Sequence, residues 1–207
     1  MLHTVDHPLI AEELTRLRDP ECSSPEFRQR VRRVASLMVT AVTADLETTI
    51  QECVTPLEIT SGVKVTKKII LVPVLRAGLG FLDGFLDLIP QASVAHIGLA
   101  RNEETLVPEP YYLKHPPSLG EFDIIILDPM LATGGSAIEA IRSLRAVGAL
   151  SIRFACLVAA PEGVSALGEA YPDVPIYTAC LDRCLNSRGY ILPGLGDAGD
   201  RLFGTCG

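Results

Sequence analysis

Residues 126–141, ILDPMLATGGSAIEAI, decide the fold, because a strand pattern runs into a helix pattern through a short loop. The apolar run ends on Asp128, the loop passes through residues 133–136, Thr-Gly-Gly-Ser, and helix-forming residues follow at once. A charged residue at the end of a buried strand does not improve packing, and two glycines at the start of a helix do not stabilise the helix. The segment therefore predicts a strand–helix unit whose loop serves a ligand.

Strand and helix patterns alternate on both sides of this unit. Short runs rich in β-formers, most of them apolar on both faces, occupy residues 69–74, 94–99, 123–128, 152–160 and 176–181. Helical patterns occupy residues 26–46, 79–89, 134–147 and 162–171. This alternation predicts an α/β fold with a doubly wound, mainly parallel central sheet. A further short strand is expected at 57–59, before a Ser-Gly turn.

Two segments depart from the alternation. Residues 101–121 hold four prolines and no helical period, so we predict a long arm there, in which Tyr111 and Tyr112 pack against another part of the protein. The alternative is a tolerated surface insertion. Residues 189–207 interleave glycines with apolar side chains, which indicates backbone held close to another group rather than a flexible tail.

Composition bounds the class of protein. A chain of 207 residues that is 48% hydrophobic can form one well-buried domain, expected to span 1–207 with its core at about 65–182. A net charge of −7 argues against a nucleic-acid partner. No stretch resembles a signal peptide or reaches the ~20 apolar residues of a membrane span, so no membrane partner is expected. Six cysteines without Cys-x-x-Cys spacing indicate reduced thiols and a cytoplasmic protein.

The loop after Asp128 suits a phosphate group. Ligands of open α/β sheets bind beyond the carboxyl ends of strands, and helix N-termini offer free N–H groups to anions. Glycines allow the backbone to approach the anion, Thr133 and Ser136 add hydroxyl donors, and an ionised Asp128 accepts hydrogen bonds from sugar hydroxyls. A helix cap formed by Thr133 or Ser136 explains the same residues, and spacing alone leaves both interpretations open.

Other glycine motifs match less well. The chain has no Gly-Lys pair, which excludes a P-loop. The Gly-x-Gly-x-x-Gly at 194–199 lies too close to the last residue for a βαβ unit to follow. The glycines at 78–84 follow a strand, but the third comes one residue late, which leaves only a weak dinucleotide signal.

The segment ILDPMLATGGS resembles the phosphoribosyl-diphosphate signature of the type I phosphoribosyltransferases, in the version of the uracil phosphoribosyltransferase family, which lacks a second acid before Asp128. Further blocks agree in the family's order: TADLET (43–48), VPVLRAGLGFLDG (72–84), RNEETLVPEPYY (101–112), LVAAPEG (157–163) and YILPGLGDAGDRLFGT (190–205). The resemblance therefore spans nearly the whole chain, and it implies the type I phosphoribosyltransferase fold.

The resemblance implies that 5-phosphoribosyl-1-diphosphate and uracil react to give UMP and diphosphate. It assigns donor binding to Arg76, Ala77, Gly78, Arg101, Asp128, Pro129, Met130, Leu131, Ala132, Thr133, Gly134, Gly135, Ser136 and Asp197. It assigns uracil to a hood at about 183–207, completed by N-terminal elements, through Ile191, Gly196, Asp197 and Ala198. Within these sets, catalysis is expected to depend on Arg76, Arg101, Asp128 and Asp197.

The same resemblance implies a Mg²⁺ cofactor held mainly by substrate oxygens and water, with no direct protein ligand. It further implies a GTP activator and a homo-oligomer, either dimer or tetramer. Two alternatives stay open at this point. One is an RNA-binding regulator with a phosphoribosyltransferase fold, which the acidic balance disfavours. The other is a nicotinamide-dependent reductase that uses the glycines at 78–84.

Overall fold

The computed structural model describes residues 1–101 and 108–205, which form an α/β arrangement around one large sheet. The strands of this sheet are β1 (Leu2–Thr4), β4 (Lys68–Leu75), β5 (Ser93–Val94), β6 (His96–Arg101), β7 (Pro108–Lys114), β8 (Phe122–Leu127), β9 (Met130–Leu131), β10 (Ser151–Ala159) and β11 (Ile176–Leu181). Its main order is β1-β11-β10-β8-β4-β6-β7, with every pair parallel except β6 and β7. The predicted mainly parallel sheet is confirmed.

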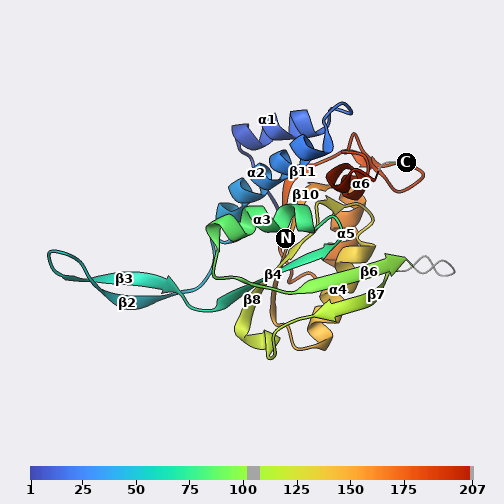
Figure 1. Cartoon of the computed structure of the whole chain (residues 1–207). Helices are drawn as coiled ribbons and strands as arrows, with labels where there is room; N and C mark the ends of the chain where they lie inside the picture. The colour runs from blue at the N-terminus through green and yellow to red at the C-terminus, as the bar shows by residue number, and fades with distance from the viewer. Residues whose placement is uncertain (102–107, 206–207) are drawn as a thin grey trace.

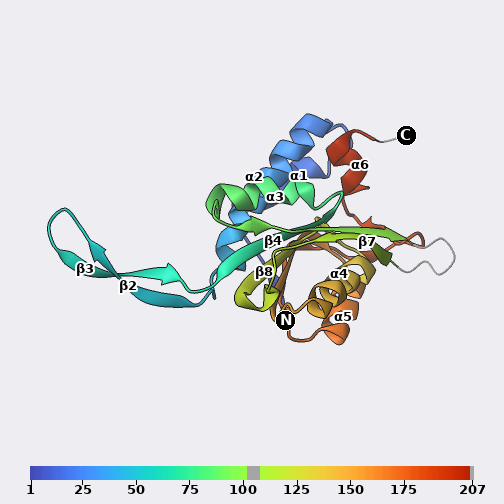
Figure 2. The same ribbon diagram turned by 60° about the horizontal axis from the view of Figure 1, so that its bottom comes forward.

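Helices cover both faces of the sheet (Figure 2). One face carries α1 (Pro8–Leu17), α2 (Ser24–Val42) and α3 (Leu79–Leu88), and the other carries α4 (Gly135–Ala146) and α5 (Pro161–Ala170). Strand β4 shows why the sheet is apolar throughout. Ile69 and Leu71 pack toward α2 and α3, whereas Ile70 and Val72 pack toward α4. Successive side chains of a strand point to opposite faces, so burial of both faces requires an unbroken apolar run.

A long hairpin of β2 (Thr48–Val54) and β3 (Ile59–Val65) projects from the body of the protein (Figure 1). The short strand expected at 57–59 and the Ser-Gly turn after it are wrong, because Ser61 and Gly62 lie inside β3. The turn lies at residues 55–58 instead. Pro56 has no N–H to donate to a strand ladder, which favours the turn there.

The predicted arm at 101–121 is largely ordinary structure in its described part, and residues 102–107 lie outside the described residues. Strand β7 pairs antiparallel with β6, and a 3-10 turn, η1 (Leu119–Glu121), follows. The ring of Tyr111 lies over Gly98 of the neighbouring strand, but Tyr111 is 62% exposed and Tyr112 is 44% exposed, so the two rings are not buried against the body of the protein. The prolines made this strand hard to predict from the sequence. An edge strand tolerates proline because one side of it needs no N–H donor for a neighbouring strand.

The C-terminal segment forms β12 (Cys184–Leu185), β13 (Ile191–Leu192) and α6 (Ala198–Phe203), and we call residues 183–205 the hood. Ile191, Leu195 and Leu202 are buried in the same core as α1 and α2. The Arg201 guanidinium donates to Asp19 O and Leu17 O, each at 2.5 Å. The hood is therefore anchored to the N-terminal helices, although its large side chain Tyr190 is 47% exposed.

No helix among residues 1–101 and 108–205 combines the length and apolar content that a bilayer crossing requires. The cysteines in this part of the chain, Cys22, Cys53, Cys156, Cys180 and Cys184, are all free. Burial raises the pKa of the Cys156 thiol to about 12, so this thiol stays protonated and unreactive at neutral pH.

Candidate functional site

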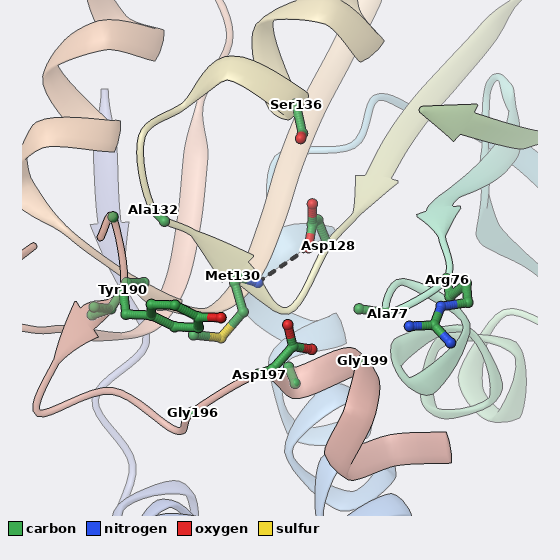
Figure 3. Close-up of a pocket in the computed structure, with 13 residues that line it drawn as sticks. Arg76, Ala77, Asp128, Met130, Ala132, Ser136, Tyr190, Gly196, Asp197 and Gly199 are labelled. Carbon is green, nitrogen blue, oxygen red and sulfur yellow. Dashed lines mark hydrogen bonds between the residues drawn. The ribbon is translucent and has the colours of Figure 1, made fainter. Parts of the chain in front are cut away.

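A cavity of about 340 Å³ opens where the carboxyl ends of β4 and β8 face the hood (Figure 3). Its lining residues are Arg76, Ala77, Asp128, Met130, Ala132, Ser136, Gly189, Tyr190, Ile191, Gly196, Asp197, Ala198 and Gly199. Three segments far apart in the sequence thus meet at one edge of the sheet. That edge is where parallel α/β sheets bind their ligands.

A smaller cavity of about 180 Å³ adjoins the first one at the start of α4. We call the loop that lines it, residues 130–137, the cradle. The helix cap is Gly134, so neither Thr133 nor Ser136 caps this helix by a side-chain hydrogen bond. Thr133 Oγ1 accepts only from Gly135 N, at 3.5 Å. Apart from this long contact, no side chain of the described residues caps the first-turn N–H groups, so the cradle is suited to an anion.

The one positive φ in the cradle is that of Gly134, at +86°. A Cβ atom at this position would lie 3.1 Å from Gly163 O in α5. Gly134 therefore serves both the left-handed turn and the close contact with α5. Gly135 begins α4 and faces the smaller cavity, where a side chain would compete with a bound anion.

Asp128 stands at the end of β8, on the wall of the larger cavity. Burial raises the pKa of its carboxyl group from 3.8 to about 7, although the hydrogen bond that Oδ1 accepts from Met130 N opposes this shift. Near neutral pH, the carboxyl group thus exists in both protonation states. The ionised form accepts hydrogen bonds from hydroxyl groups, as the sugar-binding role requires.

Arg76 follows β4, after a cis peptide bond with Leu75. Its side chain is 59% exposed, and Nη2 lies 3.2 Å from Asp200 Oδ1 in the hood. Ala77 lines the larger cavity, but Gly78 does not. The Gly78 N–H donates to Val74 O at 2.8 Å, so this N–H is already paired within the protein, and a contact of the Gly78 backbone with the donor stays a prediction.

The predicted uracil residues Ile191, Gly196, Asp197 and Ala198 all line the larger cavity. Asp197 caps α6, because its Oδ1 accepts from Asp200 N at 2.9 Å. One oxygen of Asp197 is thereby occupied, and the other has no hydrogen-bond partner within the described part of the chain, so a water molecule or a ligand can bind there. Ala198 is the first residue of α6, a position whose N–H has no acceptor within the helix.

Some predicted donor residues do not face the larger cavity. Pro129 lines neither cavity, and its carbonyl accepts from Leu157 N and Val158 N, each at 3.0 Å. Leu131, Thr133, Gly134 and Gly135 line only the smaller cavity. Arg101 ends β6, and its side chain lies outside the described part of the structure.

Sequence reasoning missed five residues of these cavities, namely Ala137, Arg188, Gly189, Tyr190 and Gly199. The side chains of Tyr190 and Met130 both line the larger cavity (Figure 3). The aromatic residue Tyr190 next to Gly189 could have indicated a site for a planar ligand from the sequence alone. Arg188 lacks such a local signal, because its proximity to the cradle depends on the tertiary fold.

Comparisons with known proteins agree with this geometry. A family model described as "Uracil phosphoribosyltransferase" matches residues 4–205. The uracil phosphoribosyltransferase of Ligilactobacillus salivarius is 55% identical over 202 residues, which cover 97% of each protein. The solved structure of the AQ2163 protein from Aquifex aeolicus is 36% identical, covers 98% of each chain and has a TM-score of 0.91. An adenine phosphoribosyl transferase from Trypanosoma brucei shares the fold, with 16% identity, 87% and 83% coverage of the two chains and a TM-score of 0.57.

Proposed function

The chain belongs to the uracil phosphoribosyltransferase family, and we propose that it converts uracil and 5-phosphoribosyl-1-diphosphate into UMP and diphosphate. The observation that carries this proposal is the junction of the cradle and the hood around adjoining cavities. The cradle suits the 5-phosphate, and backbone groups of the hood suit a planar base. Neither the RNA-binding regulator nor the reductase receives support from the relatives.

The reaction breaks the bond between ribose C1 and diphosphate and joins C1 to N1 of uracil, which loses its proton. Positive charge develops on the sugar as diphosphate leaves, so alignment and electrostatics can supply most of the catalysis. We assign the 5-phosphate to the cradle and the ribose hydroxyls to ionised Asp128. Arg76 and Arg101 are assigned to the diphosphate, since guanidinium groups bind phosphate oxygens in a bidentate manner.

Arg76 must leave Asp200 or share its hydrogen bonds when diphosphate binds. The pair is exposed and its contact is 3.2 Å long, so this rearrangement costs little. Diphosphate binding is thereby coupled to α6, which also presents Ala198 to the base site.

We propose Mg²⁺ as the cofactor, because the donor is polyanionic. Within residues 1–101 and 108–205, no group of three or more His, Cys, Asp or Glu side chains could hold a metal ion. Substrate oxygens and water would therefore supply most ligands, with the unoccupied oxygen of Asp197 reaching the ion through water. Bound Mg²⁺ would neutralise charge on the leaving diphosphate.

We also propose a cytoplasmic homo-oligomer, a dimer or tetramer, and activation by GTP. The β2–β3 hairpin supports association, since its apolar side chains have no cover in the described chain and a second copy could bury them. The exposed large side chains on this hairpin are Ile50, Val54, Leu57, Ile59, Val63 and Val65. GTP activation rests on the family resemblance alone.

A radiochemical assay tests the proposed function. The protein is incubated with labelled uracil, 5-phosphoribosyl-1-diphosphate and Mg²⁺, and UMP and diphosphate are quantified separately. The two products should form in equal amounts, and Arg101→Ala should lower kcat/KM by ~10² or more. If purified, folded protein forms no UMP, the proposal fails, and RNA binding and NAD(P)H oxidation should then be measured to test the alternatives.

A further inference from the structure

We propose that Arg188 binds the 5-phosphate of the donor and of UMP from the hood side, opposite the cradle. This inference rests on the proposed function and adds a residue to it. The carrying observation is that Arg188 and the cradle line the same 180 Å³ cavity.

Charge makes Arg188 distinctive in this cavity. The described residues that line it are Met130, Leu131, Ala132, Thr133, Gly134, Gly135, Ser136, Ala137, Arg188 and Gly189. Among these residues, Arg188 supplies the only charged side chain. A phosphate monoester carries about −1.5 to −2 charges at pH 7. Backbone N–H groups offer only partial positive charge, whereas a guanidinium adds a full charge and several fixed donors.

The Arg188 guanidinium is also available. In the part of the chain that the structure describes, it has no hydrogen-bond or ion-pair partner. Two other arginines of the described structure that lie near the site, Arg76 and Arg201, differ in this respect. Arg76 pairs with Asp200, and Arg201 donates to backbone carbonyls of Leu17, Asp19 and Leu195.

The turn that carries Arg188 is fixed by its own hydrogen bonds. Asn186 Oδ1 accepts from Arg188 N at 2.9 Å and from Tyr190 N at 3.0 Å. The Asn186 N–H donates to Tyr190 O at 2.8 Å, and its carbonyl accepts from Gly189 N at 3.0 Å. One rigid turn therefore presents Arg188 to the smaller cavity and Tyr190 to the larger one.

This arrangement makes the 5-phosphate a bridge between the cradle and the hood. A ligand that carries both a base and a phosphate then contacts the hood twice, through the base-binding segment and through Arg188. A nucleoside without the phosphate contacts it once. Arg188 should therefore contribute to the affinity difference between UMP and uridine, and not to uridine binding itself.

The test measures dissociation constants of UMP and uridine by titration calorimetry, with uridine measured by displacement where binding is weak. The variants are Arg188→Met, Arg188→Lys and Arg183→Met. Arg183 is a matched control, because it is an exposed hood arginine that lines neither cavity. UMP formation from uracil is assayed in parallel for the wild-type protein.

The quantity compared is the dissociation constant of uridine divided by that of UMP. Arg188→Met should lower this ratio about tenfold, and its affinity for uridine should stay within twofold of the wild-type value. Arg188→Lys should retain most of the ratio, and Arg183→Met all of it. A fall of less than threefold in Arg188→Met, or an equal fall in Arg183→Met, would overturn the assignment. If the wild-type protein forms UMP while Arg188→Met keeps its ratio, only the role of Arg188 is refuted. If the wild-type protein forms no UMP, the proposed function itself fails.

Discussion

Arg18 and Asp182 form a bidentate ion pair, with Nη1–Oδ2 and Nη2–Oδ1 distances of 2.9 and 2.7 Å. The pair also holds both backbone polar atoms of Gly194, since Arg18 Nη1 donates to Gly194 O at 2.9 Å and Gly194 N donates to Asp182 Oδ2 at 2.8 Å. Gly194 has a φ of +62°, and a Cβ there would lie 2.1 Å from Ile191 O. The ion pair therefore fixes a turn that only glycine can form, directly before the proposed base site.

Arg18→Met should weaken uracil binding more than donor binding. We expect the uracil KM to rise roughly tenfold and the donor KM to change less than threefold, because the turn positions the hood and not the cradle. The free energy of unfolding should fall by ~1–3 kcal/mol, below the value for a fully buried pair, since the Arg18 side chain is 25% exposed. Steady-state kinetics and urea unfolding measure both effects.

Arg32→Met provides the control for this variant. Arg32 makes a similar bidentate pair with Asp87, but both side chains are largely exposed and line neither cavity of the site. This change should leave both KM values intact and change the free energy of unfolding little, because solvent and salt screen an exposed ion pair. Equal rises in the two KM values of Arg18→Met would show that the ion pair has no specific role at the base site.

The pKa of Asp128 predicts how stability depends on pH. Its value of about 7 in the folded state exceeds the ordinary 3.8, so the folded protein binds this proton more tightly than the unfolded chain does. The corresponding stability is present below about pH 4 and is lost as the pH rises to about 7. Asp128→Asn is neutral throughout, so its unfolding free energy relative to wild type should increase between pH 5 and 8, by at most ~4 kcal/mol. A constant difference would contradict the raised pKa.

The same group predicts the pH dependence of donor use. If ionised Asp128 accepts hydrogen bonds from the ribose hydroxyls, kcat/KM for the donor should rise with an apparent pKa near 7. The donor phosphates also titrate, so the comparison requires Asp128→Asn, which should have a low and flatter profile. Profiles of equal shape in the two proteins would exclude Asp128 as the titrating group.

Gly134→Ala and Gly135→Val should separate folding from ligand binding. The alanine variant forces a Cβ into a left-handed conformation 3.1 Å from Gly163 O, and should lose at least ~1–2 kcal/mol of stability. The valine variant starts a helix without a positive φ, so it should fold well and raise the donor KM tenfold or more, because its side chain occupies the anion site. An unchanged donor KM in folded Gly135→Val would refute the cradle.

Ala198→Pro removes one proposed donor to uracil. The first position of a helix tolerates proline, so α6 should persist while the N–H is lost. We expect the uracil KM to rise at least tenfold with the donor KM nearly constant, whereas Ala198→Gly, which keeps the N–H, should resemble wild type. Circular dichroism checks the fold, and intact uracil kinetics in the proline variant would remove Ala198 from the base site.

The sheet and the strand–loop–helix unit around Asp128 were predictable because their signals are local. Residues 69–74 are apolar on both faces, and a strand, a glycine loop and a helix are consecutive around Asp128. The β2–β3 hairpin was not predictable in this way. Its apolar side chains Ile50 and Val63 are 82% and 71% exposed in the single chain. Apolar residues of a strand are normally expected to be buried, so the sequence alone does not reveal this exposure.

Contacts between distant segments account for the other differences. The Gly78 N–H is used by Val74, and a Cβ at Gly78 would lie 2.3 Å from Leu127 O, so this glycine serves packing between β4 and β8. Arg188 reaches a cavity formed by residues more than fifty positions earlier. No local sequence pattern predicts the packing of Gly78 or the position of Arg188, because both depend on how the sheet and the hood are assembled.

A crystal structure of the protein with UMP tests the site assignment most directly. Phosphate oxygens should lie ~2.7–3.2 Å from the N–H groups at the start of α4 and from the Arg188 guanidinium, with uracil between Tyr190 and Ala198. UMP bound in the reverse orientation, with its phosphate at Arg76 and its base in the cradle, or bound outside both cavities, would contradict this assignment.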